Sequence, residues 1–424
     1  MEKIEQKCSV YIRKWLRLPK HLNNTAIYGK KQQLALPIPS IFEEFKAGKV
    51  RTVLMLRYSK DNEIRDDPPG VRTYRKWNAE KEVDHAISSL KHQDVVGATQ
   101  TGREGFGTTS FKPFGMCKEK EKRDAVIMEV RRTEQEKRHL HLVQCSQQGQ
   151  CLGWEERVIE RKLKWNEIWE WEPARLSFLL KATYDMLPTP ANLVRWKISE
   201  DDKCKCGKKG TLRHILSACP LGLKERYTWR HNQVLRVFSK YLEEQMKDIN
   251  EGKIPSTEVR KKVRFHKEGQ RGKSVAPSKS TKKDERWSGS WNVAADLDTQ
   301  VVFPVVTTTQ RPDLVVWNSE KKHVLIMELT VPWEDNIEQA EERKEERYAD
   351  LIDACKDKGW ETEYYHLAVG CRGYVDRKIA TLFRNRFGLQ SNKVKRLIKD
   401  LQEAAEKSSL FVWLKRDDTS WAEV

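Results

Sequence analysis

The sequence contains no run of about 18 apolar residues, which is the length that a membrane-spanning helix needs. We therefore expect no membrane partner. The first residues, MEKIEQKC, also lack the apolar core of a secretory signal peptide. The nine cysteines are thinly spread and odd in number, which argues against a secreted disulfide framework. A reducing compartment and a metal site fit this use of cysteine better.

The composition indicates a basic chain with several folding units. Its 424 residues are enough for two to four domains, and 38% of them are hydrophobic. Lysine and arginine number 80 against 62 acidic residues, so the formal net charge is +18. Such an excess predicts a polyanionic partner, usually nucleic acid, although a generic basic protein is the alternative.

The pattern along the chain predicts an α+β, multi-domain protein with four parts. Residues 1–150 form a mixed, largely helical region, and residues 151–250 form a helical region that contains a compact Cys/His segment. Residues 251–290 are basic and poor in apolar side chains, which predicts a disordered linker, with a nucleic-acid-binding arm as a further reading. Residues 291–424 hold strand and helix signals. These signals predict strands at 300–306, 313–317, 323–330 and 363–369, and helices at 335–358, 376–387 and 392–408.

Two acidic residues stand at the ends of neighbouring predicted strands. Asp313 opens one strand and Glu328 lies near the end of the next, so antiparallel pairing would bring both carboxylates to one end of a small sheet. Paired carboxylates suit Mg²⁺, which prefers oxygen ligands. Lys344 lies on the following helix and shares a face with Ala340 and Tyr348, so its amine could reach the pair. The alternative is an ordinary α/β protein with chance acids, although a carboxylate inside LIMELTV is costly to bury alone.

The Cys/His segment offers four metal ligands within 16 residues. Cys204, Cys206, His214 and Cys219 follow the pattern C-x-C-x7-H-x4-C, which favours a structural Zn²⁺ site. The spacing of the first pair is tighter than usual. The alternative is a set of unrelated cysteines and a core histidine. A closed four-ligand site leaves no open position for substrate, so catalysis at this zinc is not expected.

Four blocks of the last third resemble a known family. Arg311-Pro312-Asp313, Glu-Leu-Thr-Val-Pro (328–332), Ala-x3-Lys-x3-Tyr (340–348) and Val-Gly-Cys-Arg-Gly-Tyr (369–374) resemble the PD-(D/E)xK-like endonuclease of site-specific non-LTR retrotransposons. The resemblance implies a nuclease that nicks chromosomal DNA to prime reverse transcription. It implies that Asp313 and Glu328 bind Mg²⁺ and that Lys344 is the catalytic lysine. It also implies nucleic-acid contacts at Arg311, Tyr348 and Arg372. Where restriction enzymes commonly carry a lysine two residues after the second acid, this chain has Thr330.

Weaker likenesses extend upstream. The Cys/His segment resembles the CCHC segment of the same elements. Residues 229–235 resemble another signature, which implies that Arg230 and His231 contact nucleic acid or the nuclease site; the alternative is a plain helix face with a satisfied histidine. Residues 11–60 resemble the thumb and linker that follow the polymerase palm. The aspartate pairs at 66–67, 201–202 and 417–418 lack the strand-hairpin setting of a polymerase, so no reverse-transcriptase active site is expected.

These likenesses predict partners and a location. The partners would be DNA, the element RNA and a separate reverse transcriptase, and the location would be the nucleus, with the cytoplasm as the alternative. The competing hypothesis is a catalytically inactive retroelement remnant that binds nucleic acid through the zinc segment and the basic linker.

Overall fold

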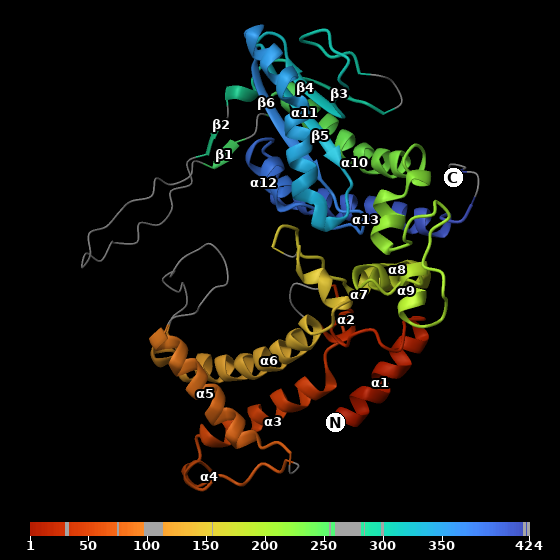
Figure 1. Cartoon of the computed structure of the whole chain (residues 1–424). Coiled ribbons are helices and arrows are strands. Elements are labelled where there is room, and N and C mark those ends of the chain that lie inside the picture. The colour runs from red at the N-terminus through yellow and green to blue at the C-terminus, as the bar shows by residue number, and fades with distance from the viewer. Residues whose placement is uncertain are drawn as a thin grey trace. The chain divides into compact units, whose positions relative to one another are not determined.

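The computed structural model describes residues 1–29, 34–73, 76–96, 113–154, 156–253, 256–258, 281–283, 285–297, 301–418 and 421. The chain forms two compact units (Figure 1): residues 1–152 with 161–186, and residues 153–160 with 187–424. Among the described helices, none combines the length and the apolar character needed to cross a membrane.

The first unit is helical. Its core lies between three helices that pack on one another, α3 (Ile41–Arg57), α5 (Ala79–Val96) and α6 (Glu119–Val143). Although α6 is dense in charge, Val126 and Val130 are buried in this core, and the buried Glu134 pairs with Lys46 at 2.8 Å. The remaining helices of the unit are α1 (Glu2–Trp15), α2 (Thr25–Tyr28), α4 (Asn62–Asp66), α7 (Trp165–Glu170) and α8 (Pro173–Thr183).

The second unit is built on a four-stranded mixed sheet with the order β3-β4-β5-β6. Strands β3 (Asn292–Ala295), β4 (Leu314–Asn318) and β5 (His323–Thr330) are antiparallel, and β6 (Glu361–Ala368) pairs with β5 in parallel. Helix α11 (Ile337–Asp357) makes the crossover between β5 and β6 that a parallel pair requires. The other helices are α9 (Pro190–Arg195), α10 (Arg226–Asn250), α12 (Arg377–Asn385) and α13 (Ser391–Leu414).

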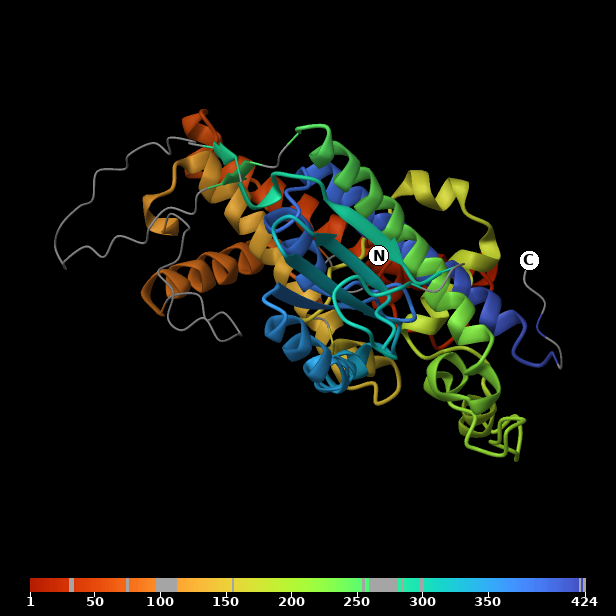
Figure 2. The same cartoon turned by 90° about the horizontal axis from the view of Figure 1, so that it is seen from above.

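Each face of the sheet has its own helical cover. Leu314, Leu325 and Met327 point to one face and pack in a core with α10, α12 and α13. Val315 and Ile326 point to the other face and pack against α11. Figure 2 shows the strands between these two helical layers. Because side chains alternate along a strand, the same alternation turns Glu328 toward α11.

The predicted α+β fold class is confirmed, with two differences in the strands. Residues 301–306 are not a strand: Phe303, Val305 and Val306 pack in the cluster on the α11 side of the sheet, while Val302 is exposed. Strand β3, at 292–295, was not predicted from its short, weakly apolar sequence.

Most of the basic segment predicted as a disordered linker, including residues 259–280, lies outside the described residues. Within it, β1 (Ser256–Glu258) pairs with β2 (Thr281–Lys283). At its far end Trp287 is fully buried in the core of the second unit, where its ring lies 4.6 Å from that of Trp291.

Candidate functional site

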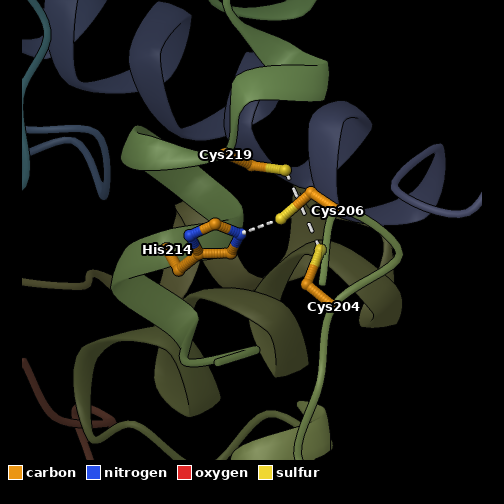
Figure 3. Close-up of side chains that lie close together, drawn as sticks. All are labelled: Cys204, Cys206, His214 and Cys219. Carbon is orange, nitrogen blue, oxygen red and sulfur yellow. Dashed lines mark hydrogen bonds between the residues drawn. The ribbon is translucent and has the colours of Figure 1, made fainter. Parts of the chain in front are cut away.

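The four predicted zinc ligands converge (Figure 3). One donor atom each of Cys204, Cys206, His214 and Cys219 lies within 4.8 Å of all the others. The sulfurs of Cys204 and Cys219 are 3.8 Å apart, and Cys206 Sγ is 3.1 Å from His214 Nε2. Zn–S bonds of about 2.3 Å in a tetrahedron place neighbouring sulfurs roughly 3.8 Å apart. The cluster can therefore hold a metal ion, and its donor set suits zinc.

A tight turn explains the short C-x-C spacing. Gly207 N donates to Cys204 O at 2.8 Å, and Cys204 N donates to Lys208 O at 2.8 Å, so both sulfurs lie on one small loop. Gly207 has φ +81°, a conformation that favours glycine. Burial, with the charge of Lys208, lowers the pKa of His214. The imidazole is thus kept neutral, which is the form that binds a metal.

Asp313 and Glu328 meet at the end of the sheet. Leu314 pairs with Met327 in the β4–β5 register, which places Asp313 opposite Glu328. The Asp313 backbone N–H donates to Glu328 Oε2 at 3.3 Å, and the Leu329 N–H donates to Asp313 Oδ2 at 2.7 Å. Burial and the nearby Asp313 raise the pKa of Glu328, against the opposing effect of Lys344. Two carboxylates in this setting favour a cation.

Helix α11 brings a positive charge to these acids through Lys344. The Lys344 ammonium donates to Glu328 Oε1, and only 3% of the Glu328 side chain is exposed. One turn away on each side, Ala340 and Tyr348 are buried, so this helix face lies close to the sheet. The Tyr348 hydroxyl donates to the Arg311 carbonyl at 2.9 Å, two residues before Asp313. The three residues predicted as a catalytic set therefore lie together.

His231, on α10, lies beside Asp313. Its Nε2 lies 3.3 Å from Asp313 Oδ2 and 3.3 Å from Leu329 O. Burial disfavours the charged ring, but the hydrogen bond and charge of Asp313 outweigh this and raise the pKa of His231. The sequence resemblance left open whether His231 contacts nucleic acid or the nuclease site, with a plain helix face as the alternative. Its position beside the first acid comes from the packing of α10 against the sheet, which no local pattern encodes.

Three residues expected to contact nucleic acid are buried instead. Arg230 and Arg372 are each 2% exposed and Tyr348 is fully buried, so none can lie against a nucleic acid in this conformation. Arg230 donates to the carbonyls of Leu216 and Val331, and so joins the zinc segment to the end of β5. The apolar stems or rings of these side chains lie in the core while their polar ends bind buried oxygens, which suits cross-linking inside a core.

Arg311 is the exposed member of that predicted set. About half of its side chain, 53%, is accessible, and it pairs with Asp296 at 2.9 Å. Solvent screens an ion pair this exposed, so Arg311 can exchange Asp296 for another anion at little cost.

An open cleft of about 460 Å³ connects the zinc segment to Asp313. Arg213 and Arg343 are exposed and stand on its walls, and Asp313 and Lys344 line it as well. Arg213 donates to Asn336 Oδ1 at 2.9 Å across the cleft. Its other lining residues come from α10, from the end of β5 and from α11. The cleft thus combines exposed arginines with the Asp313 carboxylate.

Within the described residues, sequence reasoning missed one further group of close metal-type ligands, His323, Glu361 and Glu363. His323 Nε2 is 2.8 Å from Glu363 Oε1, and Arg386 donates to both oxygens of Glu363, at 2.5 Å and 2.9 Å. Tyr365 donates to Glu363 as well. Because cationic and hydroxyl donors already satisfy this carboxylate, the group acts as a structural network.

The comparisons with known proteins were negative. The sequence matches no protein-family model and none of the curated proteins with which it was compared.

Proposed function

We propose that this chain is a Mg²⁺-dependent DNA endonuclease with a PD-(D/E)xK-like core, derived from a site-specific non-LTR retrotransposon. The observation that carries the proposal is the meeting of Asp313, Glu328 and Lys344 at one end of the sheet. They come from two strands and a helix, in the order that the resemblance implies. The cleft beside them has arginines at its rim, which suits a phosphate backbone.

Each residue of the proposed site has its own role. Asp313 and Glu328 would hold a Mg²⁺ ion, and the pair fits this role because the two acids lie close enough for the charge of Asp313 to raise the pKa of the buried Glu328. When bound, such an ion activates water and stabilises the negative charge that develops on the scissile phosphate. Lys344 would place a positive charge and a proton donor beside Glu328. Tyr348 holds the Arg311 carbonyl and thereby fixes the entry to β4.

The wider assignments follow from this proposal. The enzyme would nick target DNA in the nucleus to prime reverse transcription, with the element RNA and a separate reverse transcriptase as partners. The zinc segment would stabilise the wall of the cleft through Arg230, which reaches from α10 to Leu216. The net charge of +18 supports a polyanionic partner.

A plasmid-nicking assay with the full chain tests the proposal. We expect supercoiled plasmid to be nicked with Mg²⁺ and not with EDTA. Asp313→Ala and Lys344→Met should each slow nicking by about 10²–10³-fold, the range typical for losing one charge contact to a transition state. Lys356→Met is the matched control, since Lys356 lies on the same helix and is 56% exposed.

Two results would count against the endonuclease. Equal nicking by wild type and Asp313→Ala would assign the activity to a contaminant. DNA binding that weakens steeply with salt, without any cleavage in Mg²⁺ or Mn²⁺, would instead favour the inactive nucleic-acid-binding remnant.

A further inference from the structure

The ring of His231 is surrounded by hydrogen-bond acceptors. Its Nε2 faces Asp313 Oδ2 and the Leu329 carbonyl, each at 3.3 Å, and its Nδ1 lies 3.2 Å from Asn232 Oδ1. A neutral imidazole has one N–H and one lone pair, so one of its nitrogens would point a lone pair at oxygen. All of these contacts are favourable when a positive centre takes the place of that bare lone pair.

That positive centre can be a proton or a metal ion. When a metal ion takes the Nε2 lone pair, Nδ1–H can donate to Asn232 Oδ1, which lies 3.2 Å away, so both ring nitrogens keep a partner. A carbonyl or amide oxygen that accepts from the second ring nitrogen is the usual partner of a metal-binding histidine. His231 also lines the open cleft, so an ion can enter from solvent.

We propose that His231 is a third protein side chain that binds the divalent ion, through Nε2, together with Asp313 and the Leu329 carbonyl. This inference rests on the proposed function and deepens it. An imidazole ligand is better matched to Mn²⁺ or another transition metal than to Mg²⁺, which prefers oxygen. The site therefore selects Mn²⁺ over Mg²⁺ more strongly than an all-oxygen site does.

The neighbouring contacts keep His231 in place for this role. Arg230, the preceding residue, is buried and donates to Leu216 O at 2.6 Å and to Ser409 Oγ at 3.1 Å. It also reaches Val331 O at 3.2 Å, two residues beyond Leu329. The start of α10 is therefore tied to the end of β5 without help from His231. Replacing His231 should change the ligand set and leave the fold intact.

Manganese bound to the zinc-loaded full chain tests the inference directly. Pulsed electron paramagnetic resonance should detect ¹⁴N coupling to Mn²⁺ in the wild type and not in His231→Ala. The same variant should bind Mn²⁺ about 10–100-fold more weakly and Mg²⁺ with a smaller loss. His366→Ala is the matched control, because His366 Nε2 is 2.8 Å from Thr330 Oγ1. It should keep the ¹⁴N signal.

The outcomes separate this inference from the proposed function. Mn²⁺ that binds in an Asp313-dependent way without ¹⁴N coupling, or with coupling that survives in His231→Ala, overturns the role of His231 and leaves the endonuclease standing. Absence of any Asp313-dependent Mn²⁺ binding overturns both. Unchanged zinc content and circular dichroism in His231→Ala show that a lost signal reflects the ligand and not unfolding.

Discussion

Glu334 and Arg372 form an ion pair that is almost wholly enclosed, with Arg372 Nε 2.7 Å from Glu334 Oε2 and side chains that are 0% and 3% exposed. The second carboxylate oxygen accepts the backbone N–H of Arg372 at 2.8 Å. The guanidinium lies 3.8 Å from the Trp333 ring centre and 4.8 Å from that of Trp154. This pair fixes the turn after β6 against the segment that leads into α11.

Breaking this pair should strongly destabilise the second unit. Glu334→Gln leaves the Arg372 charge buried without its partner, and such a loss costs about 3–5 kcal/mol. Urea unfolding followed by tryptophan fluorescence measures the change. Asp353→Asn removes an exposed pair with Lys356 and should cost about 0–1 kcal/mol. Equal costs for the two variants would show that burial does not matter here.

Gly370 lies against the same carboxylate. A Cβ added at this position would lie 2.6 Å from Glu334 Cδ, and Arg372 holds that carboxylate so that it cannot move away. Gly370→Ala should therefore destabilise the protein by about 1–3 kcal/mol through overpacking. Gly48→Ala, in the interior of α3 with nothing within 4 Å, should stabilise by about 0.5–1 kcal/mol. Thermal unfolding of both variants tests the opposite signs.

The Cys/His cluster should bind one metal ion per chain. Purified protein should contain about one equivalent of zinc, and Cys206→Ser should lose it, because three ligands hold a structural ion poorly. Metal analysis and release to a colorimetric chelator measure the content. Cys117→Ser is the control, since Cys117 lies in the other unit and outside the cluster. Retention of zinc by Cys206→Ser would exclude the assigned ligand set.

Glu363 should contribute stability that acid removes. Burial alone would raise its pKa, but hydrogen bonds from His323, Arg386 and Tyr365 bring it well below its usual range. A carboxyl with a depressed folded-state pKa stabilises above the unfolded pKa of about 4.3, and this stability is lost as the pH falls below that value.

Comparison of Glu363→Gln with wild type at several pH values tests this sign. The difference in unfolding free energy between the two proteins should be largest near pH 7 and should shrink below about pH 4. Glu361→Gln is the control, because Glu361 is 69% exposed and lies 3.6 Å from His323. A difference that grows in acid would contradict the depressed pKa.

Local patterns determined several parts of this protein. The β-rich apolar run HVLIMELT predicted β5 with its bounds, since a short continuous apolar run is consistent with a strand buried on both faces. The ligand spacing of the Cys/His segment predicted the cluster, because all four ligands come from one short stretch. Asp313 and Glu328 were predicted to meet, since one hairpin joins their strands.

Only the tertiary structure decided the rest. Residues 301–306 have the composition of a strand, but Phe303, Val305 and Val306 pack on the α11 side of the sheet without backbone pairing to a neighbouring strand. Arg230 and Arg372 look like surface cations in the sequence, yet buried oxygens from distant segments surround them. His231 reaches Asp313 across 82 residues because α10 packs on the sheet. A sequence pattern records the neighbours along the chain, whereas burial and long-range partners depend on how helices and strands pack.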